Sequence, residues 1–502
     1  MIINPPTADL LSSLLAQPDF LPRLPQGRRL YEATKTAILS QQLSPGSKLP
    51  STRDLARDLG IARNTIIGAF DQLLAEGFVS TVTGSGTYVS TTLPVAIRPK
   101  GKVANLPESV PENLFSGAAP LSKRGAHLTG FAAGDRFEIQ PFAPGDSDFS
   151  MFPFKIWQRL QNRVWRDSWS ELLDYGKSGG YLPLRRAIAE YLRVSRSVKV
   201  SIDQVMITAG TQQSLDLCAQ LLADVGDTAW VENPCYWGAT RVFESCDLNL
   251  HPIAVDSQGM APSESDLSTK PRLIYVTPSH QYPTGAVMSL ARRRMLLEFA
   301  RQENAWVLED DYDSEFRYTG RPFAALQGLD THGRVVYMGT FSKVLYPGIK
   351  VGYLVVPPVL VEPFKRALYD LHRPGQLMIQ AALADFIALG HFTTHIRKIR
   401  QAYSEKRELL RKTLVSQLQQ TITVSGEESG LHLVVELPDH VDDIALESLA
   451  AESGISVKAL SRYYIAPPVR RGLLVGYAYV NMDKIVYYGK LLAHAIQAQT
   501  KS

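Results

Sequence analysis

Short apolar segments alternate with helical stretches across the middle of this chain, and this alternation constrains its fold more than any other feature. Helical stretches such as Gln212–Leu222 and Leu290–Arg301 separate the apolar segments. Strands and helices in alternation predict an α/β domain with a mainly parallel sheet. We place this domain at residues 137–502, with a smaller α+β lobe mainly over about 360–502. The predicted strands are Val205–Thr208, Ala229–Glu232, Leu273–Thr277, Trp306–Leu308 and Val335–Met338.

Residues 1–90 predict a separate, smaller domain. A helix over about Arg28–Gln42 is followed by a second helix after Pro50, whose Ser51 and Asp54 have the spacing of a capping box. A third helix is expected over about Arg63–Glu76, and two short strands follow it around a Gly-Ser-Gly turn. Three helices and a two-stranded wing are typical of a winged helix-turn-helix. The predicted buried stripe of the third helix is Ile66, Ile67, Phe70, Leu73 and Leu74.

The distribution of charge points to a nucleic-acid partner for this first domain. The chain has 502 residues and a formal net charge of +4, and residues 1–136 contain 14 Lys and Arg residues against 10 Asp and Glu. The positive excess therefore lies entirely in the N-terminal part, as in proteins with a basic DNA-binding head. Residues 91–136 are rich in Pro, Gly, Ser and Ala, and we expect them to be a linker.

Candidate DNA contacts lie at the start of the third helix, which enters the major groove in this type of domain. Arg63, Asn64 and Thr65 would be nearest the bases. Arg53 can reach a phosphate or a base edge, and Gly86 lets the wing turn approach the DNA backbone. The alternative is a three-helix protein-interaction domain. That alternative gives no role to the glycines of the wing turn or to the polar residues Arg63, Asn64 and Thr65.

The segment over residues 45–89 reads PGSKLPSTRDLARDLGIARNTIIGAFDQLLAEGFVSTVTGSGTYV. It resembles the GntR-type winged helix along its whole length, which implies a double-stranded DNA operator as a partner. One departure is Ala62, where this family commonly has Ser. Alanine caps a helix poorly, so the third helix is expected to begin without a side-chain cap.

Polar motifs follow the predicted strands of the large domain. Lys343 comes shortly after one strand, and Asp310 lies in an acidic motif at the end of another. The carboxyl ends of parallel strands meet at the ligand-binding edge of a sheet. A lysine that forms a Schiff base with pyridoxal 5'-phosphate (PLP) needs a carboxylate for the ring nitrogen, an anion site for the phosphate and an aromatic ring to stack on. A strand, Gly210 and a helix start with Thr211 fit the anion site.

Five motifs occur in a fixed order: GTQ, ENPCY, PSHQYPTG, EDDYDSEF and FSKVLYPGIKVGY. Together they resemble the fold-type I PLP aminotransferases from about residue 145 to the C-terminus. Behind a GntR-type head, they resemble the MocR family of transcriptional regulators. The resemblance implies that Lys343 is the catalytic lysine that forms the Schiff base with PLP. It also implies that Asp310 is the partner of the ring nitrogen and that Tyr312 lies beside the ring hydroxyl. It also implies a stacking role for Tyr236, a phosphate site made by Gly210, Thr211, Gln212, Ser342 and Lys350, and a contact of Tyr175 with the phosphate of a partner subunit.

Some members of the MocR family respond to GABA. Three positions depart from the sequence patterns of the aminotransferases or of these GABA-responsive regulators. Lys350 replaces a phosphate-binding Arg, which keeps the charge and loses the bidentate fork. Tyr282 replaces the Asn of the NPTG motif, as in other MocR proteins, which argues against efficient transamination. Arg462 matches the position where GABA-sensing members bind a carboxylate, but Gly238 stands where they carry a second Arg. GABA itself is therefore not predicted as the effector.

The resemblance implies a head-to-tail homodimer and leaves three functions open. The large domain could sense a small amine or amino acid, it could sense PLP itself, or the chain could be a working aminotransferase with an accessory DNA-binding head. Effector, operator and target genes, and the choice between activation and repression, are not predicted. Turnover is the feature that separates a regulator from an enzyme.

Localisation and metal binding are predicted from what the sequence lacks. No apolar run reaches the length of about 18 residues that a membrane span needs, and no secretory signal is visible. The three cysteines form no CxxC pair, which favours a reducing cytoplasm. His391 and His395 have zinc-ligand spacing, but no third ligand lies near them in the sequence. We therefore predict a cytoplasmic protein with no membrane partner and no metal.

Overall fold

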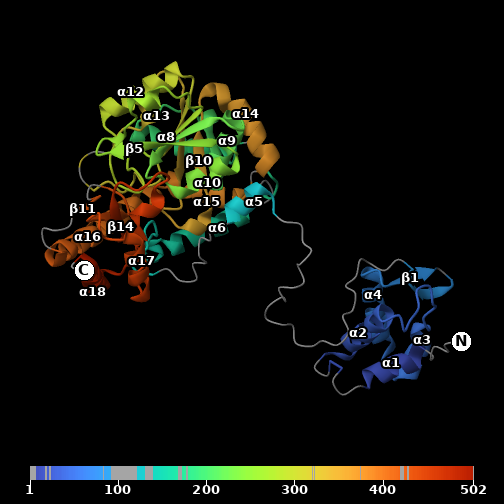
Figure 1. Cartoon of the computed structure of the whole chain (residues 1–502). Coiled ribbons are helices and arrows are strands. Elements are labelled where there is room, and N and C mark those ends of the chain that lie inside the picture. The colour runs from blue at the N-terminus through green and yellow to red at the C-terminus, as the bar shows by residue number, and fades with distance from the viewer. Residues whose placement is uncertain are drawn as a thin grey trace. The chain divides into compact units, whose positions relative to one another are not determined.

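A computed structural model describes residues 7–16, 20–21, 24–82, 84–91, 121–129, 140–167, 172–176, 179–318, 320, 323–373, 375–418, 423–426 and 429–500. The chain divides into two compact units, Met1–Pro120 and Leu121–Ser502. Most of the predicted linker over residues 91–136 lies outside the described residues. Within that range the structure describes one helix, α5 (Lys123–Thr129), which packs beside α10 (Trp237–Ser245) of the second unit (Figure 1).

Helices and a two-stranded antiparallel wing make up the first unit, as predicted (Figure 1). The Ser51 side chain accepts a hydrogen bond from the Asp54 amide at the start of α3, and Gly60 ends that helix with a φ of 66°. Ala62 is the N-cap of α4 and makes no side-chain capping bond. The elements are α1 (Thr7–Leu15), α2 (Gln26–Leu39), α3 (Thr52–Leu59), α4 (Arg63–Ala75), β1 (Val79–Val82) and β2 (Gly86–Val89).

Of the five positions in the predicted buried stripe of α4, three are buried, Ile67 is partly buried and one is exposed. Ile66, Phe70 and Leu73 are buried, whereas Leu74 is 40% exposed. Ala69 fills the interior position instead, because it shares the helix face of Ile66 and Leu73 at spacings of three and four residues.

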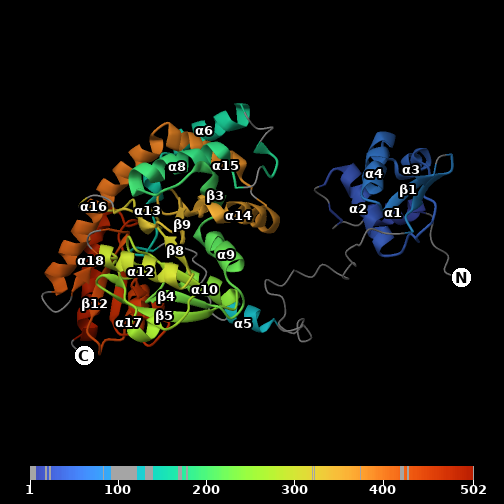
Figure 2. The same cartoon turned by 90° about the horizontal axis from the view of Figure 1, so that it is seen from above.

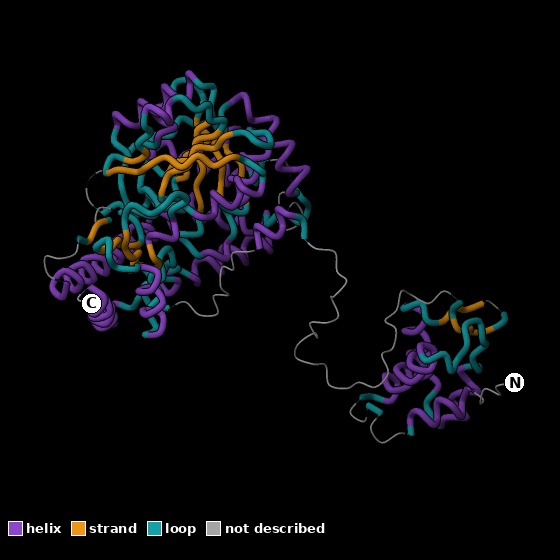
Figure 3. Tube along the Cα trace, viewed as in Figure 1, coloured by secondary structure: helices purple, strands orange, loops and turns teal. Residues whose placement is uncertain are grey.

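A mixed sheet of eight strands forms the centre of the described part of the second unit (Figure 3). The strand order is β3-β10-β9-β8-β7-β4-β5-β6. Pairing is parallel from β9 through β8, β7 and β4 to β5, whereas β10 runs antiparallel between β3 and β9. The strands are β3 (Val205–Thr208), β4 (Thr228–Asn233), β5 (Asn249–Asp256), β6 (Gly259–Met260), β7 (Leu273–Val276), β8 (Trp306–Asp310), β9 (Val335–Thr340) and β10 (Gly352–Val355).

Helices surround this sheet (Figures 1 and 2). They bury its apolar strands, and β3, β7, β8, β9 and β10 have no exposed residue. A sheet covered on both faces fits the near-continuous apolar strands of the sequence. The helices are α6 (Phe154–Asp167), α8 (Leu182–Arg196), α9 (Thr211–Leu222), α10, α11 (Glu264–Leu267), α12 (Leu290–Gln302), α13 (Leu326–Leu329), α14 (Val361–Ala367) and α15 (Leu377–Ala388).

The predicted smaller lobe contains an antiparallel sheet of order β11-β12-β14-β13 among the described residues. The two long helices α16 and α18 pack against each other beside it (Figure 2). Its elements are α16 (His391–Leu418), β11 (Val424–Ser425), β12 (His432–Leu437), α17 (Asp443–Glu452), β13 (Lys458–Ala459), β14 (Arg471–Gly476) and α18 (Ile485–Thr500).

Within the described residues, no individual helix has both the length and the apolar character needed to cross a membrane. Helices α15 and α16 meet the length and composition criteria only as a pair, which is bent by 76°.

Candidate functional site

Loops at one edge of the central sheet bring the predicted site residues together. Thr208 at the end of β3 and Thr340 at the end of β9 both pair with Gly352 of β10, so the loops that carry Gly210 and Lys343 are neighbours. A Cβ on Gly352 would lie 2.7 Å from the Gly210 Cα. Only glycine therefore fits at this close approach of two backbones.

Lys343 is anchored by a segment almost two hundred residues earlier in the chain. Its Nζ donates a hydrogen bond to the Gly145 carbonyl at 2.9 Å, and the Ser147 hydroxyl donates to the Lys343 carbonyl at 2.6 Å. Gly145 has a φ of 81°, and a Cβ there would lie 3.0 Å from Nζ. The segment that contains Gly145 and Ser147 therefore holds the lysine amine in place.

Asp310, the last residue of β8, is 3% exposed. Its Oδ2 accepts a hydrogen bond from the Tyr275 hydroxyl at 2.9 Å, and its Oδ1 has no hydrogen-bond partner among the described residues. Burial raises the pKa of this carboxyl to about 7. A buried carboxylate oxygen without a donor fits the protonated ring nitrogen of PLP, which would supply both an N–H and a positive charge.

The helix α9 starts at the predicted phosphate site. Gly210 is its N-cap, with a φ of 122°, and Thr211 is its first residue. Apart from Gly210 and its two chain neighbours, no atom of the described residues lies within 4 Å of the position of a Gly210 Cβ. The first amides of a helix and its dipole favour an anion. Gln212 extends from this turn and donates a hydrogen bond to the Tyr236 hydroxyl at 3.0 Å.

Aromatic rings surround Tyr282. Its ring centroid lies 5.8 Å from that of Tyr236, 5.7 Å from that of Tyr312 and 5.4 Å from that of Tyr463. All three pairs have an edge-to-face geometry, which aromatic pairs prefer. The hydroxyls of Tyr282 and Tyr463 lie 3.1 Å apart. The tyrosine that replaces the aminotransferase Asn therefore places an aromatic ring between the predicted stacking residue and Tyr312.

Sequence reasoning assigned no role to several residues of this cluster. Tyr275 bonds Asp310, His280 bonds Tyr312 and Asp313, and Tyr463 contacts Tyr282. His280 and Asp313 stand inside motifs already recognised, PSHQYPTG and EDDYDSEF, so their position was the available signal. Tyr275 lies in the middle of an apolar strand and gives no such signal.

Three predicted residues lie elsewhere or are exposed. Arg462 forms an ion pair with Glu447 of α17 at 2.8 Å. Tyr175 is 57% exposed, and its ring lies below the guanidinium of Arg373. Lys350 is exposed, in a left-handed backbone conformation with a φ of 49°.

The predicted DNA contacts share the surface of the first unit. Arg53, Arg63 and Asn64 are exposed, and Thr65 is partly buried against α2. Gly86 is exposed with a φ of 128°, and a Cβ there would lie 3.0 Å from the Lys48 side chain. The wing turn therefore needs glycine for its backbone conformation.

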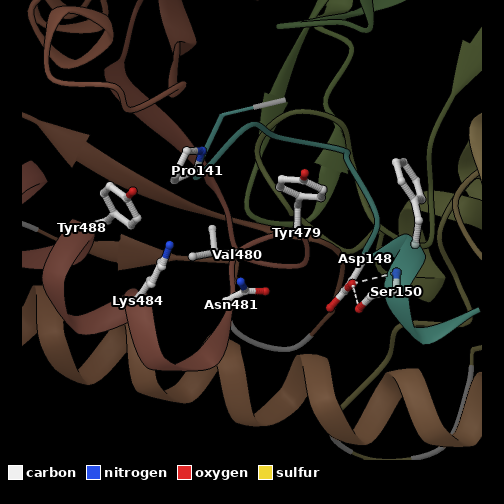
Figure 4. A pocket seen from close by; sticks show the side chains of 9 residues that line it. Pro141, Asp148, Ser150, Tyr479, Val480, Asn481, Lys484 and Tyr488 are labelled. Atoms are coloured by element: carbon white, nitrogen blue, oxygen red, sulfur yellow. Dashed lines mark hydrogen bonds between the residues drawn. The ribbon is translucent and has the colours of Figure 1, made fainter. Parts of the chain in front are cut away.

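A separate cavity of about 400 Å³ lies between the segment over residues 141–150 and the C-terminal lobe (Figure 4). Asp148, Tyr479 and Lys484 are among its lining residues, and none of the predicted cofactor residues is. Asp148 is already paired with Lys406 at 2.8 Å.

No group of three or more His, Cys, Asp or Glu side chains is placed to hold a metal in the part of the chain that the structure describes. Of the His391 and His395 pair, His395 is buried, and its Nε2 lies 2.8 Å from the Val344 carbonyl.

Two family models match the chain, one for each unit. Residues 26–89 match "Bacterial regulatory proteins, gntR family", and residues 144–474 match "Aminotransferase class I and II".

Relatives cover both units together. The probable rhizopine catabolism regulatory protein MocR of Rhizobium meliloti is 39% identical over 91% of each chain. The pyridoxine biosynthesis transcriptional regulator PdxR of Corynebacterium glutamicum is 30% identical over 91% of this chain and 93% of its own. Among solved structures, the multiple substrate aminotransferase of Thermococcus profundus is 26% identical, with a TM-score of 0.68 over 76% of this chain and 98% of its own.

Proposed function

Since the chain belongs to the MocR/GntR family of HTH-type transcriptional regulators with an aminotransferase-like domain, we propose that its large unit binds PLP and uses that site to control DNA binding. The observation that carries this proposal is the buried Asp310 oxygen without a donor, on the strand next to the one that leads to Lys343. An unpaired buried polar atom is destabilising, and a donor on a bound ligand would remove that cost.

The residues present would hold each part of the cofactor. Lys343 would attach to the aldehyde, Asp310 would bind the ring nitrogen and Tyr236 would stack on the ring. The start of α9, with Gly210, Thr211 and Gln212, would bind the phosphate together with Ser342 and Lys350. When bound, PLP supplies an electron sink for charge that develops on an amino-acid carbon.

The chain's own residues favour binding over turnover. Tyr282 presents an aromatic ring where aminotransferases carry an Asn, so one polar contact to the cofactor ring is replaced by an apolar surface. We propose that the bound ligand is a small amine or amino acid, or PLP itself, and that little or no keto product is released. Two relatives are named for the regulation of rhizopine catabolism and of pyridoxine biosynthesis, and the second name favours a pyridoxine-related ligand such as PLP.

A working aminotransferase is the second candidate, because the large unit shares its fold with the Thermococcus profundus enzyme. Turnover assays with amino-acid and keto-acid pairs separate the two. Rapid formation of keto acid would support the enzyme, and saturable binding without product would support the regulator.

We further propose a head-to-tail homodimer in which the exposed Tyr175 reaches the phosphate of a partner subunit. Other large apolar side chains, including Trp165 at 55% and Leu173 at 58%, are also exposed in the single chain. Large contiguous patches of exposed apolar surface mark association sites, and we propose that these side chains belong to one. Sedimentation of the PLP-loaded protein tests the proposal, and a stable loaded monomer would contradict it.

The cofactor assignment is tested by absorbance and borohydride reduction. Wild-type protein mixed with PLP should gain a visible absorbance band and retain cofactor covalently after reduction. Lys343→Ala should do neither. Lys365→Ala, which removes a partly buried lysine paired with Glu362, should behave like the wild type. Covalent PLP in the reduced Lys343→Ala protein would overturn the assignment.

A further inference from the structure

Three side chains from two neighbouring loops meet beside the proposed cofactor ring. His280 follows β7, and Tyr312 and Asp313 follow β8, which is the parallel neighbour of β7. The His280 Nδ1 lies 2.9 Å from the Tyr312 hydroxyl and 2.9 Å from the Asp313 Oδ2. His280 and Asp313 are each 2% exposed.

Glycines fix the position of the imidazole ring. A Cβ on Gly430 would lie 2.0 Å from the His280 Cε1, and one on Gly285 would lie 3.2 Å from its Nε2. The ring therefore fills a space that only glycine leaves open on both sides. Its Nε2 has no hydrogen-bond partner among the described residues, so Nδ1 makes the ring's polar contacts there.

Asp313 sets which ring nitrogen carries the proton. The Asp313 Oδ2 accepts a hydrogen bond when the His280 Nδ1, which lies 2.9 Å away, carries the N–H of the ring. The same N–H faces the Tyr312 oxygen, which therefore acts as the acceptor in that contact. The phenolic hydrogen of Tyr312 is then not used on His280.

Tyr312 keeps that hydrogen at neutral pH. Burial, followed by the charge of Asp313, holds the pKa of the phenol well above its usual range. The hydroxyl is thus a donor. A side-chain hydrogen bond to Asp313 is among the causes of the raised pKa, so Asp313 accepts this hydrogen here, and the ring oxygen of a bound cofactor would offer it a second acceptor.

We propose that Asp313 and His280 are positioning residues that direct the Tyr312 hydroxyl to donate to the ring oxygen of the cofactor. This inference rests on the proposed PLP site. A hydrogen bond donated to the ring oxygen draws electron density from that oxygen. The oxygen then attracts less strongly the proton on the Schiff-base nitrogen that Lys343 would form with the cofactor. Loss of that bond should therefore raise the pH midpoint at which the visible band of the bound cofactor titrates.

The test compares pH titrations of the visible band in the PLP-loaded, full-length protein. Tyr312→Phe should raise the midpoint, and His280→Leu should produce at least half of that shift. His280→Asn should titrate like the wild type, because the Asn amide nitrogen occupies the place of Nδ1 and keeps an N–H there. His280→Gln, whose amide reaches the place of Nε2 instead, should shift like His280→Leu and replaces it if the leucine variant does not fold.

A double variant and a remote control complete the design. In a Tyr312→Phe background, His280→Gln should cause no further shift, because both act through one hydroxyl. His251→Leu removes another His–Asp pair, with Asp266 at 2.8 Å, and should leave the midpoint unchanged. A wild-type midpoint in His280→Gln, or an equal shift in the Tyr312→Phe background, would overturn the inference. Wild-type protein without any visible band would instead overturn the proposed PLP site.

Discussion

At the scale of single residues, four carboxyls of the large unit have pKa values that are raised by burial. Glu232, Glu309, Asp310 and Glu315 all have pKa values raised to about 7 by burial. Buried acids of this kind cluster at functional sites, where a ligand or a charge partner compensates the cost of ionising them. Asp310 and Glu232 each have one oxygen without a hydrogen-bond partner among the described residues, and Asp310 is the one at the end of the strand next to the segment that carries Lys343.

Glu232 gives a prediction for the pH dependence of stability. Its folded pKa of about 7 lies above the ordinary value near 4.5, so the folded state binds the extra proton between those two pH values. The stabilisation is complete below about pH 4.5 and is lost as pH rises through 7, with a slope of at most about 1.4 kcal/mol per pH unit for one proton. Glu232→Gln should make the fall in the free energy of unfolding shallower by up to this amount.

Tryptophan fluorescence during denaturant unfolding at pH 5, 6, 7 and 8 measures this effect on PLP-free protein. All six tryptophans follow residue 136, so the signal reports the large unit. Glu298→Gln is the control, because the exposed Glu298 has a pKa lowered to about 2 beside Arg301, outside the tested range. An unchanged slope in Glu232→Gln would show that the carboxyl is already ionised at pH 5.

Arg63 gives a prediction for DNA specificity. Base contacts carry discrimination, whereas phosphate contacts carry salt dependence. Arg63→Ala should therefore cost about 1–3 kcal/mol on an operator selected from random DNA by the full-length protein, and should narrow the gap to scrambled duplex. Salt titrations of both duplexes make the measurement, and equal weakening of the two would identify Arg63 as a phosphate contact.

At the scale of secondary-structure elements, much of the fold could be predicted from the sequence. The five predicted strands coincide with β3, β4, β7, β8 and β9 to within two residues at each end. Hydrophobic patterns and turn residues are local, so they locate such elements well. The antiparallel insertion of β10 between β3 and β9 has no local signal, because strand order depends on pairing between distant segments.

The same limit applies to the site. Lys343, Asp310 and Gly210 could be found because each stands in a motif after a strand. The contact of Lys343 with Gly145 joins segments 198 residues apart, and no pattern in either segment predicts it. Arg462 matched a family position, but the side chain of Glu447 on α17 holds it in an ion pair.

The start of α4 gives a prediction at this scale. Ala62 provides no capping bond, whereas Ser51 caps α3. Ala62→Ser should add an acceptor for the amides of the first turn and stabilise α4 by about 1 kcal/mol. Hydrogen exchange of the peptide that covers residues 63–70 should slow, and Ser51→Ala should speed exchange in α3 by a comparable factor. Unchanged exchange in α4 would show that its first turn does not limit the stability of the unit.

At the scale of the whole molecule, the central claim is that ligand binding at Lys343 controls the DNA-binding unit. The two units are joined through residues that include 92–120, which the structure does not describe. The claim therefore concerns a coupling free energy between two sites, and this quantity can be measured without knowing their arrangement.

The most direct measurement is operator affinity with and without PLP and a panel of amines and amino acids, in wild type and in Lys343→Ala. We predict that PLP, or PLP with at least one panel member, changes the affinity of the wild type for operator severalfold, with little keto product. The Lys343→Ala protein should show no such change, and scrambled duplex should respond in neither protein. Wild-type affinity that stays constant under every condition, or an equal change in Lys343→Ala, would contradict the claim.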